Sequence, residues 1–193
     1  MNEKEVRSIL LNKLNFNQDS LYKLEIFCRE VIAYNQKFNL IAKSTEEKIW
    51  DRHVLDSAQL VKFIDFHDRS SLSDLGTGAG FPGIVLAIFN RNPKFHVKLY
   101  EKSRVKIKFL KSVCNKLNIK ANIYENDYNT HNINSNYVIS RAFKKLEEHL
   151  RISREIIKSK HKLIILKGKN AEEEIKMLNN NYNYSYSLEK SIT

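Results

Sequence analysis

The sequence predicts an α/β fold: a parallel sheet with helices on both faces, preceded by a helical extension. Three observations predict it. Apolar residues recur at helical spacing in the first third of the chain. From Ser71 onward, short apolar runs alternate with helical segments, which is typical of right-handed β-α-β crossovers. A glycine-rich turn joins the first run to the following helix. We expect a helical extension over residues 1–66 and a sheet domain over residues 67–193.

Three helices are expected before the sheet. The first covers about residues 3–14, and the second covers 18–38. The third opens at an S-x-x-E capping box, Ser44–Glu47, and runs to about Ile64. The apolar face of the second helix consists of Leu21, Leu24, Cys28, Val31 and Phe38.

In the sheet domain, strands alternate with helices, and this alternation with apolar strands predicts a parallel sheet that is covered on both faces. Helices are expected at about 82–91, 103–118, 144–159 and 170–180. The helix over 103–118 has an apolar stripe of Val105, Phe109, Val113 and Leu117, and Tyr182–Leu188 could supply one more strand. The expected strands are Ser71–Leu75, His96–Glu101, Asn122–Glu125, Tyr137–Ser140 and Lys162–Leu166.

Charge is unevenly distributed along the 193 residues. The net charge is +11, and residues 1–66 contribute none of it, because they hold ten basic and ten acidic side chains. Within Lys94–Lys120, nine Lys or Arg residues accompany one acid, Glu101. Such a block favours a phosphate-rich partner such as a nucleic acid, and a solvated helix face explains it about equally well.

Composition argues against several other classes. The two cysteines, Cys28 and Cys114, form no C-x-x-C motif and fall on expected helices, where burial is their usual fate. The six histidines form no H-E-x-x-H motif, so no metal site is expected. No apolar run reaches about 18 residues, and the first residues do not resemble a secretory signal. We expect a soluble cytoplasmic protein that binds neither metal nor membrane.

Ligands of parallel sheets bind where strands end, so the residues that follow each strand matter most. After the first strand comes Gly76-Thr77-Gly78-Ala79-Gly80-Phe81. Its alternate glycines allow a tight turn and close approach of a ligand to the backbone. The spacing G-x-G-x-G differs from the dinucleotide motif G-x-G-x-x-G, and no Lys-Ser/Thr follows as in a phosphate-binding P-loop.

Polar residues follow the other strands. Glu101 ends the second strand, where an acid can accept hydrogen bonds from both ribose hydroxyls of an adenosine, or can simply favour the start of the next helix. Tyr128 and Asn129 follow the third strand and suit an adenine clamp or an ordinary turn. Arg141 and Lys167 follow the fourth and fifth, as cations at the cleft or as solvated strand ends. Together these features suggest S-adenosylmethionine rather than NAD.

The chain resembles the bacterial small-subunit (16S) rRNA 7-methylguanosine methyltransferases, the RsmG/GidB family. The resemblance covers about residues 34–174 and is specific because its segments occur in order. They are Tyr34-Asn35 through Asn39-Leu40-Ile41-Ala42, Arg52–Ser57, Asp74–Gly83, Lys106 with Phe109-Leu110, Ser140–Phe143, Leu166–Gly168 and Asn170–Glu174. It implies a Rossmann-like class I S-adenosylmethionine-dependent methyltransferase.

The resemblance also implies roles for individual residues. In the loop around Gly78, Gly76 and Phe81 match residues that line the cofactor pocket. Glu101 stands where the family usually has Asp, and Tyr128 with Asn129 matches an adenine-side pair that is often Ala-Glu. Arg141 matches an arginine beside the cofactor and the incoming base, so it is our candidate catalytic residue.

Two further features follow from the resemblance. His53 and Asp56 lie on a helix that packs near the site in this family, either as a direct participant or as a buried polar pair. His53 and Lys167 are our candidates for contact with the substrate. The family's sheet normally ends in an antiparallel hairpin, whose last strand is not evident here.

The implied substrate is small-subunit ribosomal RNA or a ribosomal particle, and the chemistry fits guanine N7. This nitrogen has a lone pair and no proton, so methyl transfer to it needs alignment and exclusion of water rather than a general base. Transfer to an exocyclic amine commonly uses an N/D-P-P-Y loop, but Pro82 and Pro93 are not adjacent. Transfer to pyrimidine carbon 5 needs a cysteine, typically beside proline, and neither Cys28 nor Cys114 qualifies.

Three other functions remain open at this point. A methyltransferase for another RNA or for a protein would share the cofactor site. An oxidoreductase with a nucleotide cofactor would share the fold, but would be expected to carry G-x-G-x-x-G. A non-enzymatic RNA-binding module would explain the charge but not the combination of the glycine loop with Glu101.

Overall fold

The computed structural model describes residues 1–141, 145–168, 170–178 and 185–193. Its centre is a five-stranded parallel sheet with the strand order β3-β2-β1-β4-β5. The order reverses at β1, which pairs with β2 on one side and with β4 on the other. The expected parallel α/β fold is confirmed. The strands are β1 Ser71–Leu75, β2 His96–Glu101, β3 Ala121–Glu125, β4 Tyr137–Arg141 and β5 Lys162–Leu166.

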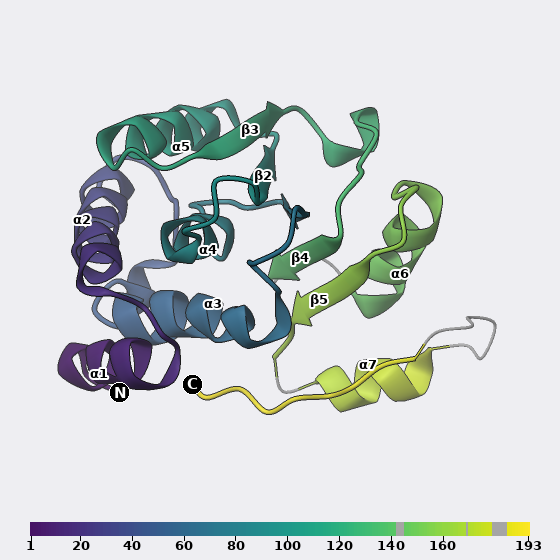
Figure 1. Ribbon diagram of the computed structural model, residues 1–193, viewed down its shortest axis with the longest axis horizontal. Coiled ribbons are helices and arrows are strands. Elements are labelled where there is room, and N and C mark those ends of the chain that lie inside the picture. The colour runs from purple at the N-terminus through teal and green to yellow at the C-terminus, as the bar shows by residue number, and fades with distance from the viewer. Residues whose placement is uncertain (142–144, 169, 179–184) are drawn as a thin grey trace.

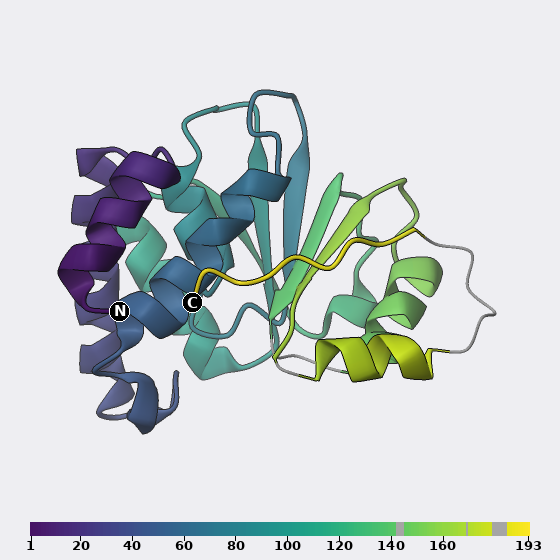
Figure 2. The same cartoon turned by 90° about the horizontal axis from the view of Figure 1, so that it is seen from below.

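Helices cover both faces of the sheet (Figures 1 and 2). One face carries α4 (Gly83–Phe89) and α5 (Arg104–Lys116), which connect β1 to β2 and β2 to β3. The opposite face carries α6 (Leu146–Glu155), and α7 (Ala171–Met177) packs against α6. This arrangement follows from right-handed crossovers on either side of the reversal at β1. Within the described part of the chain, no helix is long and apolar enough to cross a membrane.

The first two helices lie near their expected positions. They are α1 (Glu3–Lys13), which begins with a capping box between Asn2 and Glu5, and α2 (Gln18–Asn35). The expectation that α2 continues to Phe38 is wrong. The Asn35 side chain accepts hydrogen bonds from the backbone N–H groups of Leu40 and Ile41 and so turns the chain. Phe38 is therefore 40% exposed, not in the core.

The expected single helix from the Ser44–Glu47 capping box to Ile64 is also corrected. The structure has the 3-10 turn η1 (Lys43–Thr45), the π-helix η2 (Trp50–Leu55), one turn α3 (Asp56–Ala58) and the 3-10 helix η3 (Gln59–Phe63). No capping hydrogen bond begins a helix at Ser44, and the two residues between Ser44 and Glu47 have other partners: the Thr45 hydroxyl donates to the Ala42 carbonyl and Glu46 accepts from Asn35. A π-helix widens the helical turn, and such turns often occur at functional sites.

Helix α5 departs from its expected apolar stripe at one position. Phe109, Val113 and Leu117 are buried, whereas Val105 is 36% exposed. Val105 lies in the first turn, at the edge where the strands end, and the buried set begins at Ile107 instead. This exposed first turn borders the candidate site.

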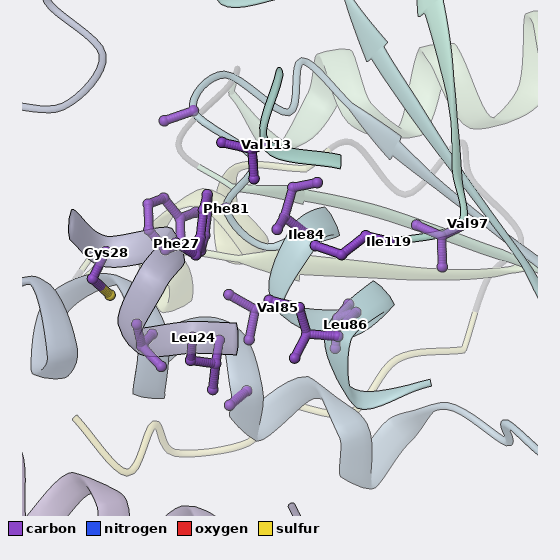
Figure 3. Packing of buried hydrophobic residues seen from close by; sticks show 14 of the residues in the cluster. Leu24, Phe27, Cys28, Phe81, Ile84, Val85, Leu86, Val97, Val113 and Ile119 are labelled. Carbon is purple, nitrogen blue, oxygen red and sulfur yellow. The ribbon is translucent and has the colours of Figure 1, made fainter. Parts of the chain in front are cut away.

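One hydrophobic cluster joins the N-terminal helices to the sheet, so packing is continuous across residue 66. Figure 3 shows Leu24, Phe27 and Cys28 of α2 packed near Phe81 and Val85. Both cysteines are buried as expected. The boundary between a helical extension and a sheet domain stays a prediction.

The C-terminal residues 185–193 form no strand. A strand was expected over residues 182–188. Residues 185–188 are not in a strand, and residues 182–184 lie outside the described residues. Figure 1 shows the segment returning from α7 toward the N-terminal helices. There the buried Gln59 side chain accepts from the Ile192 backbone and hydrogen-bonds to Ser191.

Candidate cofactor and substrate site

The glycine-rich loop follows β1 at the carboxyl edge of the sheet. Gly76, Gly78 and Gly80 have φ values of 69°, 61° and 97°, a region that side chains rarely occupy. The backbone N–H groups of Gly76 and Thr77 donate to the Tyr100 carbonyl at 3.0 and 3.1 Å. The loop is therefore fixed to the end of β2.

The glycines of this loop serve two different purposes. A Cβ atom at Gly80 would come within 2.5 Å of Ile84 Cγ1, and one at Gly83 within 2.3 Å of Leu99 Cδ2. These two glycines permit close packing of α4. A Cβ atom at Gly78 would meet nothing closer than 3.9 Å. Gly78 therefore faces open space, where a ligand can approach the backbone.

Glu101 connects this loop to the start of α5. Its Oε2 atom accepts from the Gly78 N–H at 2.9 Å, and Oε1 accepts from the Lys102 and Ser103 N–H groups at 3.0 and 2.8 Å. The residue is 8% exposed. Oε1 thus binds the start of α5, as one of the two interpretations of Glu101 predicted. The ribose role remains compatible with these contacts, since an ionised carboxylate has about four acceptor positions.

Three buried side-chain oxygens lie at the same edge, and in the described part of the chain Ser140 Oγ has no hydrogen-bond partner. They are Asp74 Oδ1 at the end of β1, Thr77 Oγ1 in the loop and Ser140 Oγ near the end of β4. Burial raises the pKa of Asp74 to about 6, and hydrogen bonds from the Thr77 side chain and from the Gly83 N–H oppose that shift. Buried polar atoms need partners, so this edge suits a polar ligand and its ordered water.

Arg141, at the end of β4, is held by residues of the N-terminal helices. Its Nη1 donates to the Arg52 carbonyl at 3.2 Å and lies 3.5 Å from Asp56 Oδ2, and its Nη2 lies 2.8 Å from His53 Nδ1. The Cζ atom lies 5.4 Å from the centroid of the Phe81 ring. Burial lowers the pKa of Arg141, and the Asp56 carboxylate opposes that shift. Arg141 therefore presents a positioned cation beside the loop.

His53 is enclosed by this arrangement. Its ring lies 5.0 Å from the Phe81 ring, its Nε2 lies 2.8 Å from the Thr45 hydroxyl, and the residue is 8% exposed. Burial, followed by the charges of Arg141 and Arg52, lowers the pKa of His53 to about 4. The expected buried pair of His53 and Asp56 is bridged by Arg141 instead. A direct contact of His53 with substrate stays a prediction.

The remaining candidates have contacts of their own. Tyr128 is 4% exposed and packs in a second core cluster with Tyr100, while Asn129 is exposed in a 3-10 turn that Asp127 caps. Lys167 pairs with Glu174 at 2.7 Å. Their roles toward adenine and substrate stay predictions. The residues 142–144 of the Ser140–Phe143 motif lie outside the described residues.

Two residues at the site were assigned no role from the sequence, although Lys106 belongs to a segment of the family resemblance. Lys106 has its Nζ atom 4.0 Å from the position of a Cβ at Gly78, so it borders the open space over the loop. Its place in the first turns of α5, close after Glu101, was the available signal. Thr45 contacts His53 from η1, eight residues earlier, and no sequence pattern indicated this contact.

A parallel sheet that reverses at β1, with a glycine loop after β1 and an anchored acid after β2, is a Rossmann-like nucleotide-binding arrangement. Together with the following family match, it is that of a class I S-adenosylmethionine-dependent methyltransferase. The profile of the family described as GidB, rRNA small subunit methyltransferase G, matches residues 20–193. The chain belongs to this family.

Curated relatives agree over most of the chain. A Pelagibacter ubique protein named Ribosomal RNA small subunit methyltransferase G is 33% identical over 189 residues, covering 95% of this chain and 88% of that one. A Mycoplasma capricolum protein of the same name is 37% identical over 179 residues, covering 90% and 76%. Among solved structures, MtNAS in complex with MTA and tNA has a TM-score of 0.50 and is 13% identical, covering 86% of this chain and 66% of that chain. This likeness shows the fold alone.

Proposed function

We propose that this protein transfers a methyl group from S-adenosylmethionine to guanine N7 in small-subunit ribosomal RNA. The observation that carries the proposal is one continuous site at the carboxyl edge of the sheet. The Gly78 backbone is anchored on Glu101, and the same loop carries Phe81 beneath the Arg141 guanidinium. The loop thus connects the cofactor side of the site to the cation on the substrate side.

Each residue has a role that this chemistry requires. Bound S-adenosylmethionine supplies an electrophilic methyl group on a sulfonium centre. The loop at Gly78 admits it closely, and Glu101 accepts from the ribose hydroxyls with the acceptor positions that its backbone contacts leave over. Phe81 excludes water from the side beneath Arg141.

Arg141 is proposed to orient the base or the cofactor rather than to act on N7. A cation aimed at N7 would oppose formation of the cationic product, so guanine O6, a phosphate or the cofactor carboxylate is the expected partner. His53 does not serve as a general base, because both ring nitrogens are engaged inside the protein and burial lowers its pKa to about 4. Attack by N7 requires no such base.

The test is methylation of ribosomal RNA from cells that lack this gene. Purified protein and S-adenosylmethionine are incubated with naked rRNA or with small ribosomal subunits, and modified nucleotides are mapped by mass spectrometry. We expect wild-type protein to produce one 7-methylguanosine in small-subunit RNA, and the Gly78→Val variant to produce none. A methyl group at another atom, in another RNA or in a protein would contradict it. Stabilisation of the protein by NAD and not by S-adenosylhomocysteine would favour the oxidoreductase alternative.

A further inference from the structure

We propose that His53 is a positioning residue: a neutral acceptor that holds the Arg141 guanidinium in its working orientation. The inference rests on the proposed function, because Arg141 acts in that reaction. Three contacts carry it. Arg141 Nη2 lies 2.8 Å from His53 Nδ1, His53 Nε2 lies 2.8 Å from Thr45 Oγ1, and the Thr45 hydroxyl lies 2.7 Å from the Ala42 carbonyl.

These contacts fix the direction of every hydrogen bond. Arginine can only donate, so His53 Nδ1 must be unprotonated and accept. In a neutral ring the proton then resides on Nε2, which donates to Thr45 Oγ1. The Thr45 hydroxyl in turn donates to the Ala42 carbonyl, which can only accept. One tautomer of His53 satisfies the whole chain of contacts, and the other places an N–H against Arg141.

A neutral acceptor has an advantage over a carboxylate at this position. It orients the guanidinium without cancelling its charge, so the cation remains available to an anionic or carbonyl group of a ligand. The Asp56 carboxylate lies further from Arg141, at 3.5 Å, and also accepts from Gln59 and from Thr193. His53 therefore makes the shorter of the two side-chain contacts to the guanidinium.

The His53 ring is itself held in place by the Phe81 ring and, at Nε2, by Thr45. It lies 5.0 Å from the Phe81 ring, the same ring over which the Arg141 guanidinium lies at 5.4 Å. Phe81 also packs against Phe27 of α2 at 4.9 Å. The position of His53 therefore depends on η1, η2 and α2, and a shift of any of these three segments would move the Arg141 guanidinium on β4.

Two isosteric variants test this role. In His53→Asn the amide oxygen takes the place of Nδ1, so the acceptor for Arg141 is kept and the contact to Thr45 is lost. In His53→Gln the amide reaches the place of Nε2, so the contact to Thr45 is kept and the acceptor for Arg141 is lost. We expect His53→Asn to keep kcat within about threefold, and His53→Gln to lower kcat roughly tenfold to a hundredfold, the scale of misplacing a catalytic group by about 1 Å. The Tm values of the two variants should not follow the order of their kcat values.

A purely structural role predicts a different result. Both variants would then lose activity in proportion to their loss of Tm, and that outcome would overturn the inference. Wild-type kcat in a folded His53→Gln variant would overturn it as well. In an Arg141→Gln background, exchanging His53 for Gln should change kcat less than twofold, because a residue that acts through Arg141 has no effect once Arg141 is gone.

Nuclear magnetic resonance gives a readout that does not depend on methyl transfer. At pH 7 the nitrogen shifts of His53 should show a neutral ring protonated on Nε2. The Arg141 Nη protons should be resolved by slow guanidinium rotation in wild type and in His53→Asn, and averaged in His53→Gln. An imidazolium or an Nδ1-protonated ring would refute the inference even if the enzyme is active. Failure of wild type to methylate guanine N7 would refute the proposed function while leaving these spectra interpretable.

Discussion

The two halves of the site are built in different ways. On the cofactor half, Glu101 binds backbone N–H groups of its own sheet domain, and its most distant described partner, Gly78, is only 23 residues away. On the substrate half, Arg141 is held by Arg52, His53 and Asp56, which lie 85 to 89 residues earlier in the chain. The cofactor half is therefore a local product of one β-α-β unit, whereas the substrate half requires the N-terminal helices to be docked.

The difference predicts different sensitivities. Substitutions in the cofactor half should change ligand affinity while the packing of the N-terminal helices persists. Substitutions at the contacts of Arg141 should change kcat through the placement of its guanidinium, because these contacts come from helical segments that one hydrophobic cluster holds against the sheet. The following experiments separate the two halves.

The largest effect is expected at Gly78. We predict that Gly78→Val abolishes S-adenosylmethionine binding in titration calorimetry while the protein remains folded. The side chain would enter the open space over the loop, and the positive φ of 61° would cost about 1–2 kcal/mol of stability. Binding with wild-type affinity would show that the cofactor does not lie over this loop.

Gly80→Val is the matched control in the same loop. Its Cβ would come within 2.5 Å of Ile84 Cγ1, inside the core rather than over the ligand. We expect it to lower the Tm more than Gly78→Val does, because Ile84 and α4 must shift to make room. Equal Tm values for the two variants would mean that the loop glycines do not divide into a ligand-facing and a packing class.

The substrate half should respond to pH through His53. Burial, with the charges of Arg141 and Arg52, lowers its pKa from the ordinary 6.5 to about 4. Between pH 4 and pH 6.5, His53 is protonated in the unfolded chain and neutral in the folded protein. The stability associated with neutral His53 is thus fully present above pH 6.5 and is lost as the pH falls toward 4. From pH 7 to pH 5 the loss should be about 2 kcal/mol.

Urea unfolding of wild type and His53→Asn at both pH values measures this effect. His53→Asn lacks the titrating ring and should not lose this stability. On going from pH 7 to pH 5, its free energy of unfolding relative to wild type should therefore rise by about 2 kcal/mol. Asp74 shifts in the opposite direction, since its pKa is raised from 3.8 to about 6, but it is present in both proteins and cancels in the difference. A difference that is independent of pH would mean that His53 titrates normally in the folded protein.

At Glu101 we expect a loss of affinity of about 1–3 kcal/mol for S-adenosylmethionine in Glu101→Ala, the scale of hydrogen bonds to a charged group. The variant should also lose some stability, because the Gly78 and Ser103 N–H groups lose their acceptor. Glu101→Asp, which restores the residue usual in the family, is the control and should retain most affinity. A deoxyribose analogue should bind the alanine variant and wild type almost equally. If the analogue loses as much affinity as the cofactor does, Glu101 does not bind the ribose.

The same division explains how much could be predicted from the sequence. All five strands and the glycine loop with Glu101 were predictable, because strand periodicity and loop spacing are local signals. The individual contacts of Arg141 were not, since Arg52, His53 and Asp56 reach Arg141 only through packing between distant segments. The helix from Ser44–Glu47 to Ile64 was mispredicted for a related reason: contacts between distant residues, such as Asn35 with Glu46, shape this segment, and a local capping pattern does not show them. The purpose of each glycine also required the structure, because Ile84 and Leu99 decide which of them tolerates a Cβ atom.

The smallest effect is expected on the surface of α5, which begins beside Glu101 on the cofactor half. Lys108 is exposed, and no ion pair involves it within the described ranges of the chain. Lys111, one turn later, pairs with Glu125 at the end of β3. If this helix contacts RNA, Lys108→Glu should leave the affinity for S-adenosylmethionine unchanged. For RNA, the slope of the logarithm of the binding constant against the logarithm of the salt concentration should fall by about one, the value for one lost phosphate contact. Lys111→Glu should change the slope less, because its charge is already partly neutralised by Glu125. Filter binding across a salt series measures both slopes. Equal, unchanged slopes would place the RNA on the substrate half alone, around Arg141, and would make the basic block of Lys94–Lys120 a solvated helix face.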